Sequence, residues 1–74
     1  LECMGLIMID VTVNGKSIKL DSSMNLTDLL RFLNVDSQYV AVAHNGEVVQ
    51  VLDLMCIVVN DGDEVEIVRP VGGG

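Results

Sequence analysis

Apolar and polar residues alternate in the first third of the chain. From residue 6 onward the positions on one side are Ile7, Ile9, Val11 and Val13. This period of two is typical of a β-strand with one buried face. Asn14-Gly15 then favours a tight primed turn, because both residues tolerate positive φ. Residues 17–20, in which Ile18 and Leu20 share a face, should therefore pair back as a second strand.

A leucine stripe predicts the helix that covers the apolar side of this hairpin. Its members recur at spacings of three, four and seven: Leu26, Leu29, Leu30 and Leu33. Asn25 can cap the start of the helix, Asp28 suits the positive first turn, and Asn34 ends it. A helix of about three turns at most is too short to be stable alone in water, so its stability must come from packing on the sheet.

The middle of the chain predicts further strands in less detail. Residues 39–43 are apolar on both faces, as expected of a central strand, and Asn45-Gly46 is a second turn signal. We expect His44 to be a surface residue of that turn. Residues 47–56 mix a short strand with a crossover, and their periodicity does not separate strand from short helix.

The last predicted strand covers residues 64–68, after a turn at residues 60–63, and its Val65 and Ile67 should face the core. The order of elements allows the first and last strands to lie side by side. We therefore predict an α+β fold, a ubiquitin-like β-grasp with a mixed sheet of four to five strands and one main helix packed on one face. Residues 6–69 would form this domain, residues 1–5 a disordered or vector-derived start, and residues 70–74 a flexible tail.

Charge and composition argue against nucleic-acid binding, membrane association and a metal site. Eleven acidic and four basic residues give a net charge of -7, which argues against binding to nucleic acid or to an anionic membrane. No apolar run approaches the roughly 20 residues that cross a bilayer, so we expect a cytoplasmic protein. Cys3, Cys56 and His44 are too few for a four-ligand metal site, and no motif supports a catalytic pair of Cys56 and His44. We expect no resident metal or cofactor.

The end of the chain is the candidate functional segment. Gly72, Gly73 and Gly74 offer no side chain to a core, but bare glycines could pass through a narrow channel and deliver a terminal carboxylate to a buried site. Just before them, the acidic residues Asp63, Glu64 and Glu66 are candidates for docking a basic partner. The alternative for the glycines is an ordinary disordered chain end, and the alternative for the acidic residues is a solvent-exposed strand face and turn without a partner.

In this order, these features resemble the ThiS-type ubiquitin-like sulfur carriers of thiamine biosynthesis, relatives of the MoaD-type carriers of molybdopterin synthesis. The resemblance covers nearly all of the chain from about residue 6. It rests on Val13-Asn14-Gly15, the leucines of the helix, residues 40–46, and residues 61–67 leading to Val71-Gly72-Gly73-Gly74. No single piece is specific, but their order, the short chain and the terminal Gly-Gly together are.

The resemblance implies a function without catalytic residues in this chain. A ThiF-type adenylating enzyme, using ATP, would convert the Gly74 carboxylate into an acyl adenylate, and a sulfur donor protein would then supply sulfur to form a thiocarboxylate. A ThiG-type thiazole synthase would receive the sulfur. Gly72 and Gly73 would thread the partners' channels, and Pro70 would keep the base of the arm extended. The chain would be a protein co-substrate and not an enzyme.

Two other functions remain open at this stage. A MoaD-like carrier would keep the chemistry and serve molybdopterin synthase. A ubiquitin-like interaction or modifier module would form an isopeptide bond through Gly74 or no bond at all, although Lys16 and Lys19 offer few sites for chains built on itself. An enzyme in its own right is least favoured, because the sequence contains no nucleophile-base motif or phosphate-binding loop.

Overall fold

The fold begins with the predicted antiparallel hairpin in a computed structural model that describes residues 8–69. Strand β1 (Ile9–Val13) pairs with β2 (Lys16–Leu20) in a register that places Val11 opposite Ile18. Both turn residues between them have positive φ, 51° at Asn14 and 83° at Gly15. This is the geometry that a primed turn requires and that Asn and Gly tolerate.

The leucine stripe forms helix α1 (Leu26–Phe32), which follows the two-residue strand β3 (Met24–Asn25). The Asn25 side chain accepts a hydrogen bond of 2.8 Å from the backbone N–H of Asp28, which confirms the predicted cap. The helix has seven residues, within the limit of about three turns that was predicted. It ends where Asn34 takes a left-handed φ of 62°.

The middle of the chain corrects two predictions. Tyr39 belongs to a 3₁₀ helix, η2 (Ser37–Tyr39), and strand β4 (Ala41–His44) begins only after it. The side chain of Asp36 accepts a hydrogen bond from the N–H of Gln38, and this local bond favours the helical turn over an earlier strand. His44 is the last residue of β4 and not a turn residue, so its side chain shares the inward face of that strand.

The region that the sequence left open contains a strand and a helical crossover. Strand β5 (Glu47–Val49) pairs with β4, and a 3₁₀ helix, η3 (Val51–Cys56), leads to β6 (Val58–Val59), which pairs with β3. The last strand, β7 (Glu64–Val68), follows a turn, as predicted.

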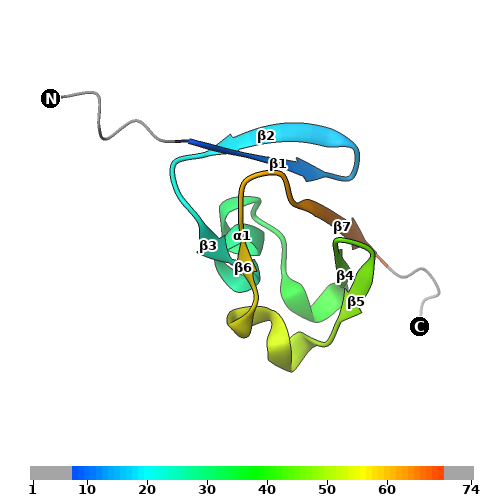
Figure 1. Cartoon of the computed structure of the whole chain (residues 1–74). Helices are drawn as coiled ribbons and strands as arrows, with labels where there is room; N and C mark the ends of the chain where they lie inside the picture. Colours follow the sequence, from blue (N-terminus) through cyan, green and yellow to red (C-terminus); the bar gives the residue numbers. More distant parts are fainter. Residues whose placement is uncertain (1–7, 70–74) are drawn as a thin grey trace, which may run out of the picture.

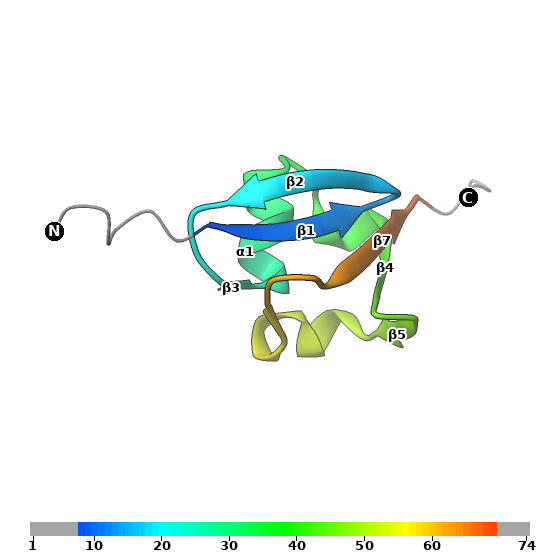
Figure 2. The ribbon, with the colours of Figure 1, turned by 45° about the horizontal axis from the view of Figure 1, so that its top comes forward.

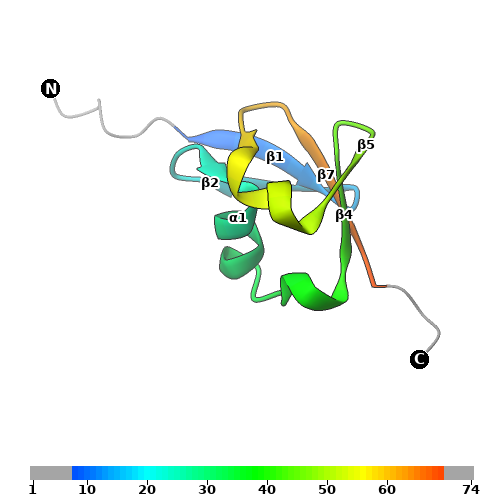
Figure 3. The same ribbon diagram turned by 90° about the horizontal axis from the view of Figure 1, so that it is seen from below.

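The five long strands form one mixed sheet in the order β2-β1-β7-β4-β5. Strands β1 and β7 are parallel neighbours, and Figure 2 shows them running in the same direction. Strands β3 and β6 form a separate small pair (Figure 1). Helix α1 lies to one side of the sheet (Figure 3). The predicted β-grasp is confirmed.

A single apolar core fills the space between α1 and the sheet. Its buried side chains come from the sheet, from α1, and from η3 and β6: Ile9, Val11, Leu20, Leu26, Leu29, Leu30, Val42, Leu54, Val59 and Val65. The opposite face of the sheet has no helix over it among the residues described. Side chains that point away from α1 are therefore open to a partner.

Candidate functional site

Strand β7 is the element that leads to the predicted site. Gly72, Gly73 and Gly74 lie outside the described residues, as does Pro70. They are attached to the chain through Arg69, which directly follows β7. Because β7 has β1 on one side and β4 on the other, the base of the glycine segment is joined to an interior strand of the sheet.

The three acidic docking candidates occupy different environments. Glu64 and Glu66 are exposed and alternate with the inward-facing Val65, so both point to the open face of the sheet. Asp63, which directly precedes β7, is only 17% exposed in its side chain. The structure therefore leaves Glu64 and Glu66 available to a partner, whereas Asp63 is engaged within the molecule.

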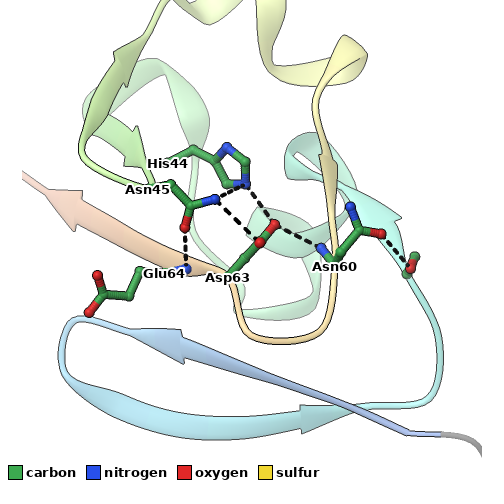
Figure 4. Close-up of polar contacts among 6 residues, drawn as sticks. His44, Asn45, Asn60, Asp63 and Glu64 are labelled. Atoms are coloured by element: carbon green, nitrogen blue, oxygen red, sulfur yellow. Dashed lines mark hydrogen bonds and ion pairs between the residues drawn. The ribbon is translucent and has the colours of Figure 1, made fainter.

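Asp63 is the centre of a polar cluster between two turns (Figure 4). Its Oδ2 lies 2.8 Å from Nε2 of His44 and accepts a hydrogen bond of 2.9 Å from the backbone N–H of Asn60. Its Oδ1 accepts a bond of 3.3 Å from Nδ2 of Asn45. The cluster ties the end of β4 to the turn that precedes β7, which is a structural role.

The pKa of Asp63 lies below its ordinary value. Burial of the carboxyl raises the pKa, but the hydrogen bonds from Asn60, His44 and Asn45 outweigh it and stabilise the charged form. A carboxyl with a lowered pKa in the folded state stabilises the fold above the unfolded-chain pKa of about 3.9. This contribution is lost as the pH falls through the lower folded value.

We predict that Asp63→Ala lowers the free energy of unfolding by about 1–3 kcal/mol near neutral pH, because it removes the charged acceptor shared by the half-buried His44, the Asn60 N–H and the Asn45 side chain. The difference from the unsubstituted chain should shrink as the pH falls below about 4, where the native carboxyl becomes protonated. Urea unfolding at a series of pH values measures both effects. Glu66→Gln is the control, since it neutralises an acidic side chain that is exposed on β7. A deficit for Asp63→Ala that persists unchanged into acid would contradict this account.

An apolar surface lies beside the exposed acids on the open face of the sheet. We define the outer patch as Ala41 and Ala43 of β4, Val48 of β5 and Val68 of β7. These four residues and Glu66 line a shallow hollow. The register places Ala41 opposite Val68 and Ala43 opposite Glu66, so the patch directly adjoins the end of β7. An apolar surface edged by acids suits a partner surface with apolar and basic side chains.

Sequence reasoning missed two features of this region. The pairing of His44 with Asp63 joins residues 19 positions apart and has no local signal. The outer patch had a signal, because Val68 continues the outward phase of Glu64 and Glu66 and is 57% exposed. One exposed apolar residue is ordinary, but several that lie together on neighbouring strands indicate a contact surface.

Residues 8–69 contain neither a metal-binding cluster nor a membrane-spanning helix. No three His, Cys, Asp or Glu side chains in this part gather to hold a metal ion. No helix in the same part is long and apolar enough to span a bilayer.

Comparisons with known proteins agree with this arrangement. The model of the ThiS family matches residues 11–74. The crystal structure of a thiamine biosynthesis protein, ThiS, from Geobacter metallireducens is 42% identical to the chain, with a TM-score of 0.81. The match covers 89% of this chain and all of that one. The solution structure of a thiamine biosynthesis protein from the same organism gives a TM-score of 0.74 at 42% identity, over 89% of this chain and 88% of that one.

Two curated relatives differ in length. A thiazole synthase of Paramagnetospirillum magneticum is 42% identical over 64 residues, which are 86% of this chain and only 20% of that protein. The chain therefore spans about a fifth of that relative. The uncharacterized protein ycf40 of Porphyra purpurea is 30% identical over 89% of this chain and 93% of its own length.

Proposed function

Because the chain belongs to the ThiS family, we propose that it is the sulfur carrier of thiamine biosynthesis and that Gly74 holds the sulfur as a thiocarboxylate. The observation that supports this most is the match at 42% identity and a TM-score of 0.81 to a thiamine biosynthesis protein. The family match also extends through Gly74, so it includes the glycine segment.

The proposed chemistry uses the chain as a substrate. A carboxylate is a poor electrophile, so an oxygen of Gly74 first attacks the α-phosphorus of ATP in a partner's active site, and pyrophosphate leaves. The resulting acyl adenylate has a good leaving group. A sulfide or persulfide sulfur then attacks the carbonyl carbon and AMP departs. If the attacker is a persulfide, a second thiol reduces the S–S bond and frees the thiocarboxylate.

Three partners follow from this chemistry. A ThiF-type adenylating enzyme performs the first step, a sulfur donor protein supplies the second, and a ThiG-type thiazole synthase accepts the sulfur. The relative named thiazole synthase supports the last assignment, because a fifth of that polypeptide is similar to this chain. A carrier fused to its acceptor would transfer sulfur at high effective concentration.

We assign the docking of these partners to the outer patch together with Glu64 and Glu66. A partner that takes Gly74 into its active site must lie close to the end of β7, and the patch includes Val68 of that strand. Glu64 and Glu66 are exposed on the same face and favour an approaching basic surface. Gly72 and Gly73 would then occupy the channel between the docked domain and the reacting atoms.

Val68→Lys is expected to weaken docking to the adenylating enzyme without unfolding the domain. The substitution removes an apolar contact of the proposed interface, and an important interface residue contributes about 1–3 kcal/mol, which corresponds to a roughly 5- to 150-fold rise in KM. The measurement is carrier-dependent pyrophosphate release at varied carrier concentration. Leu52→Lys is the matched control, because Leu52 is 86% exposed on η3, outside the outer patch. Equal effects of the two substitutions would contradict the assignment.

The function itself is tested by the choice of partner. We expect ATP–pyrophosphate exchange by a ThiF-type enzyme to depend on this chain, and the charged product to deliver sulfur to thiazole synthase. Delivery to molybdopterin synthase instead would reassign the pathway. Absence of exchange with an enzyme that is active on its own carrier would contradict a carrier function.

A further inference from the structure

The end of β7 needs a hydrogen-bond partner that β1 does not supply. In β7, odd-numbered residues direct their backbone groups toward β1: Asn14 donates its N–H to the carbonyl of Val65 at 3.0 Å. The parallel register ends at Val13 and Val65, because the chain turns away at Asn14-Gly15. Ile67 is the next residue in phase, and its N–H and C=O would face a strand that has already ended.

The side chain of Asn14 takes the place of the missing strand. Its Oδ1 accepts a hydrogen bond of 2.7 Å from the N–H of Ile67, and its Nδ2 donates one of 3.1 Å to the carbonyl of the same residue. A carboxamide has the donor and the acceptor of a peptide group, so it extends the ladder by one step. Glycine could form the turn but lacks the amide, and aspartate would keep only the acceptor.

We infer that Asn14 is a positioning residue for the base of the C-terminal arm: it fixes Ile67 at the end of β7 and so holds the point of the domain from which the arm begins. This inference rests on the proposed carrier function. Ile67 lies three residues before Pro70, and on the other edge the last paired residue of β7 is Val68, opposite Ala41. The two contacts together hold both edges of the strand at the base of the arm.

The chain contains a matched control at the other end of the same strand. Asn45 also precedes a glycine in a turn, with a φ of 50°, and its Oδ1 accepts a hydrogen bond of 2.8 Å from the N–H of Glu64. Its own N–H donates to the carbonyl of Glu64 at 2.8 Å. Asn14→Gly and Asn45→Gly therefore each remove a side-chain acceptor for an amide of β7, the first near the arm and the second at the start of the strand. Asn45→Gly also removes a hydrogen bond to Asp63, so it is the harsher change and a stringent control.

Amide hydrogen exchange tests the contact without any partner protein. In Asn14→Gly, the amide of Ile67 should exchange about tenfold faster than in the unsubstituted chain, beyond any change shared by the core amides of Val11 and Val42. In Asn45→Gly the faster exchange should appear at Glu64 instead. If the Ile67 amide in Asn14→Gly changes only as much as the core amides, the inference is overturned.

Single-turnover adenylation tests the positioning role. At temperatures where both variants are folded, we expect Asn14→Gly to lower the maximal rate about five- to tenfold, since small misplacements of a reacting group slow chemistry strongly. The half-saturating carrier concentration should stay within about twofold, because the substitution removes no side chain of the outer patch and the pairing of Val68 with Ala41 remains. Asn45→Gly should leave both parameters close to those of the unsubstituted chain. Asn14→Asp, which keeps the acceptor for Ile67, should be intermediate in rate.

Each other outcome excludes the positioning role. A rise in half-saturating concentration alone would make Asn14 a contact residue of the interface. Equal rate losses in Asn14→Gly and Asn45→Gly would mean that the two asparagine side chains only stabilise the fold. If the unsubstituted chain is not adenylated at all, the proposed function is wrong and this inference falls with it. If the unsubstituted chain is adenylated and Asn14→Gly reacts at the same rate, only the positioning role is wrong and the carrier function stands.

Discussion

Removal of Gly74, or its replacement by alanine, is expected to abolish adenylation and leave the fold unchanged. Without Gly74 the arm is one residue short, and the carboxylate cannot reach the phosphate of ATP. With alanine, a Cβ would stand beside the reacting carboxylate in a channel that we propose to fit bare glycine. Reactions that depend on a near-attack geometry lose roughly a hundredfold or more from such misplacement.

Pyrophosphate release by the adenylating enzyme measures this loss, and urea unfolding measures the fold. Val71→Ala is the control within the same segment, since it precedes the three glycines and adds no Cβ to the part that we propose to enter the channel. We expect it to retain most of the activity. Normal charging of the Gly74→Ala variant would exclude Gly74 as the reacting residue.

Leu29→Ala is expected to have the largest effect on stability. Leu29 is fully buried, at 0% exposed, between α1 and the sheet. Truncating a buried leucine costs about 2–5 kcal/mol. Small domains are commonly stable by only about 5–15 kcal/mol and bury less of their surface than large ones. The variant should therefore be close to unfolding at physiological temperature.

Urea and thermal unfolding measure this effect. Phe32→Ala on the same helix is the control, because Phe32 is 61% exposed and should cost little when truncated. The two side chains test whether the leucine stripe, and not general helix content, supports the domain. Comparable losses in the two variants would contradict the packing of α1 on the sheet.

The elements with strong local signals could be predicted from the sequence. Asn14-Gly15 and Asn45-Gly46 specify their turns by positive φ, and the leucines of α1 specify its buried face. The order of elements allowed the first and last strands to lie side by side, and β1 and β7 are indeed neighbours, paired in parallel. These features depend on local backbone preference and on a single apolar face, which a sequence records directly.

The features that could not be predicted depend on contacts between distant residues. Strands β3 and β6 have two residues each and exist because they pair with one another. His44 has no neighbour in sequence that indicates Asp63 as its partner. The tolerance of Asn14 for positive φ is a local property that indicates its turn. Its side-chain hydrogen bonds to Ile67 join positions 53 residues apart and have no local signal. The reacting segment was predicted from its glycines alone, and residues 70–74 lie beyond the described part of the chain.

The most direct test of the carrier function is the intact mass of the protein after reaction. The chain is incubated with ATP, a ThiF-type adenylating enzyme and a cysteine-derived sulfur source, and then weighed and fragmented by mass spectrometry. We predict a gain equal to the replacement of one oxygen by one sulfur, located in the fragment that contains Gly74 and absent without ATP. An unchanged mass, with an enzyme that charges its own carrier under the same conditions, would contradict the proposal.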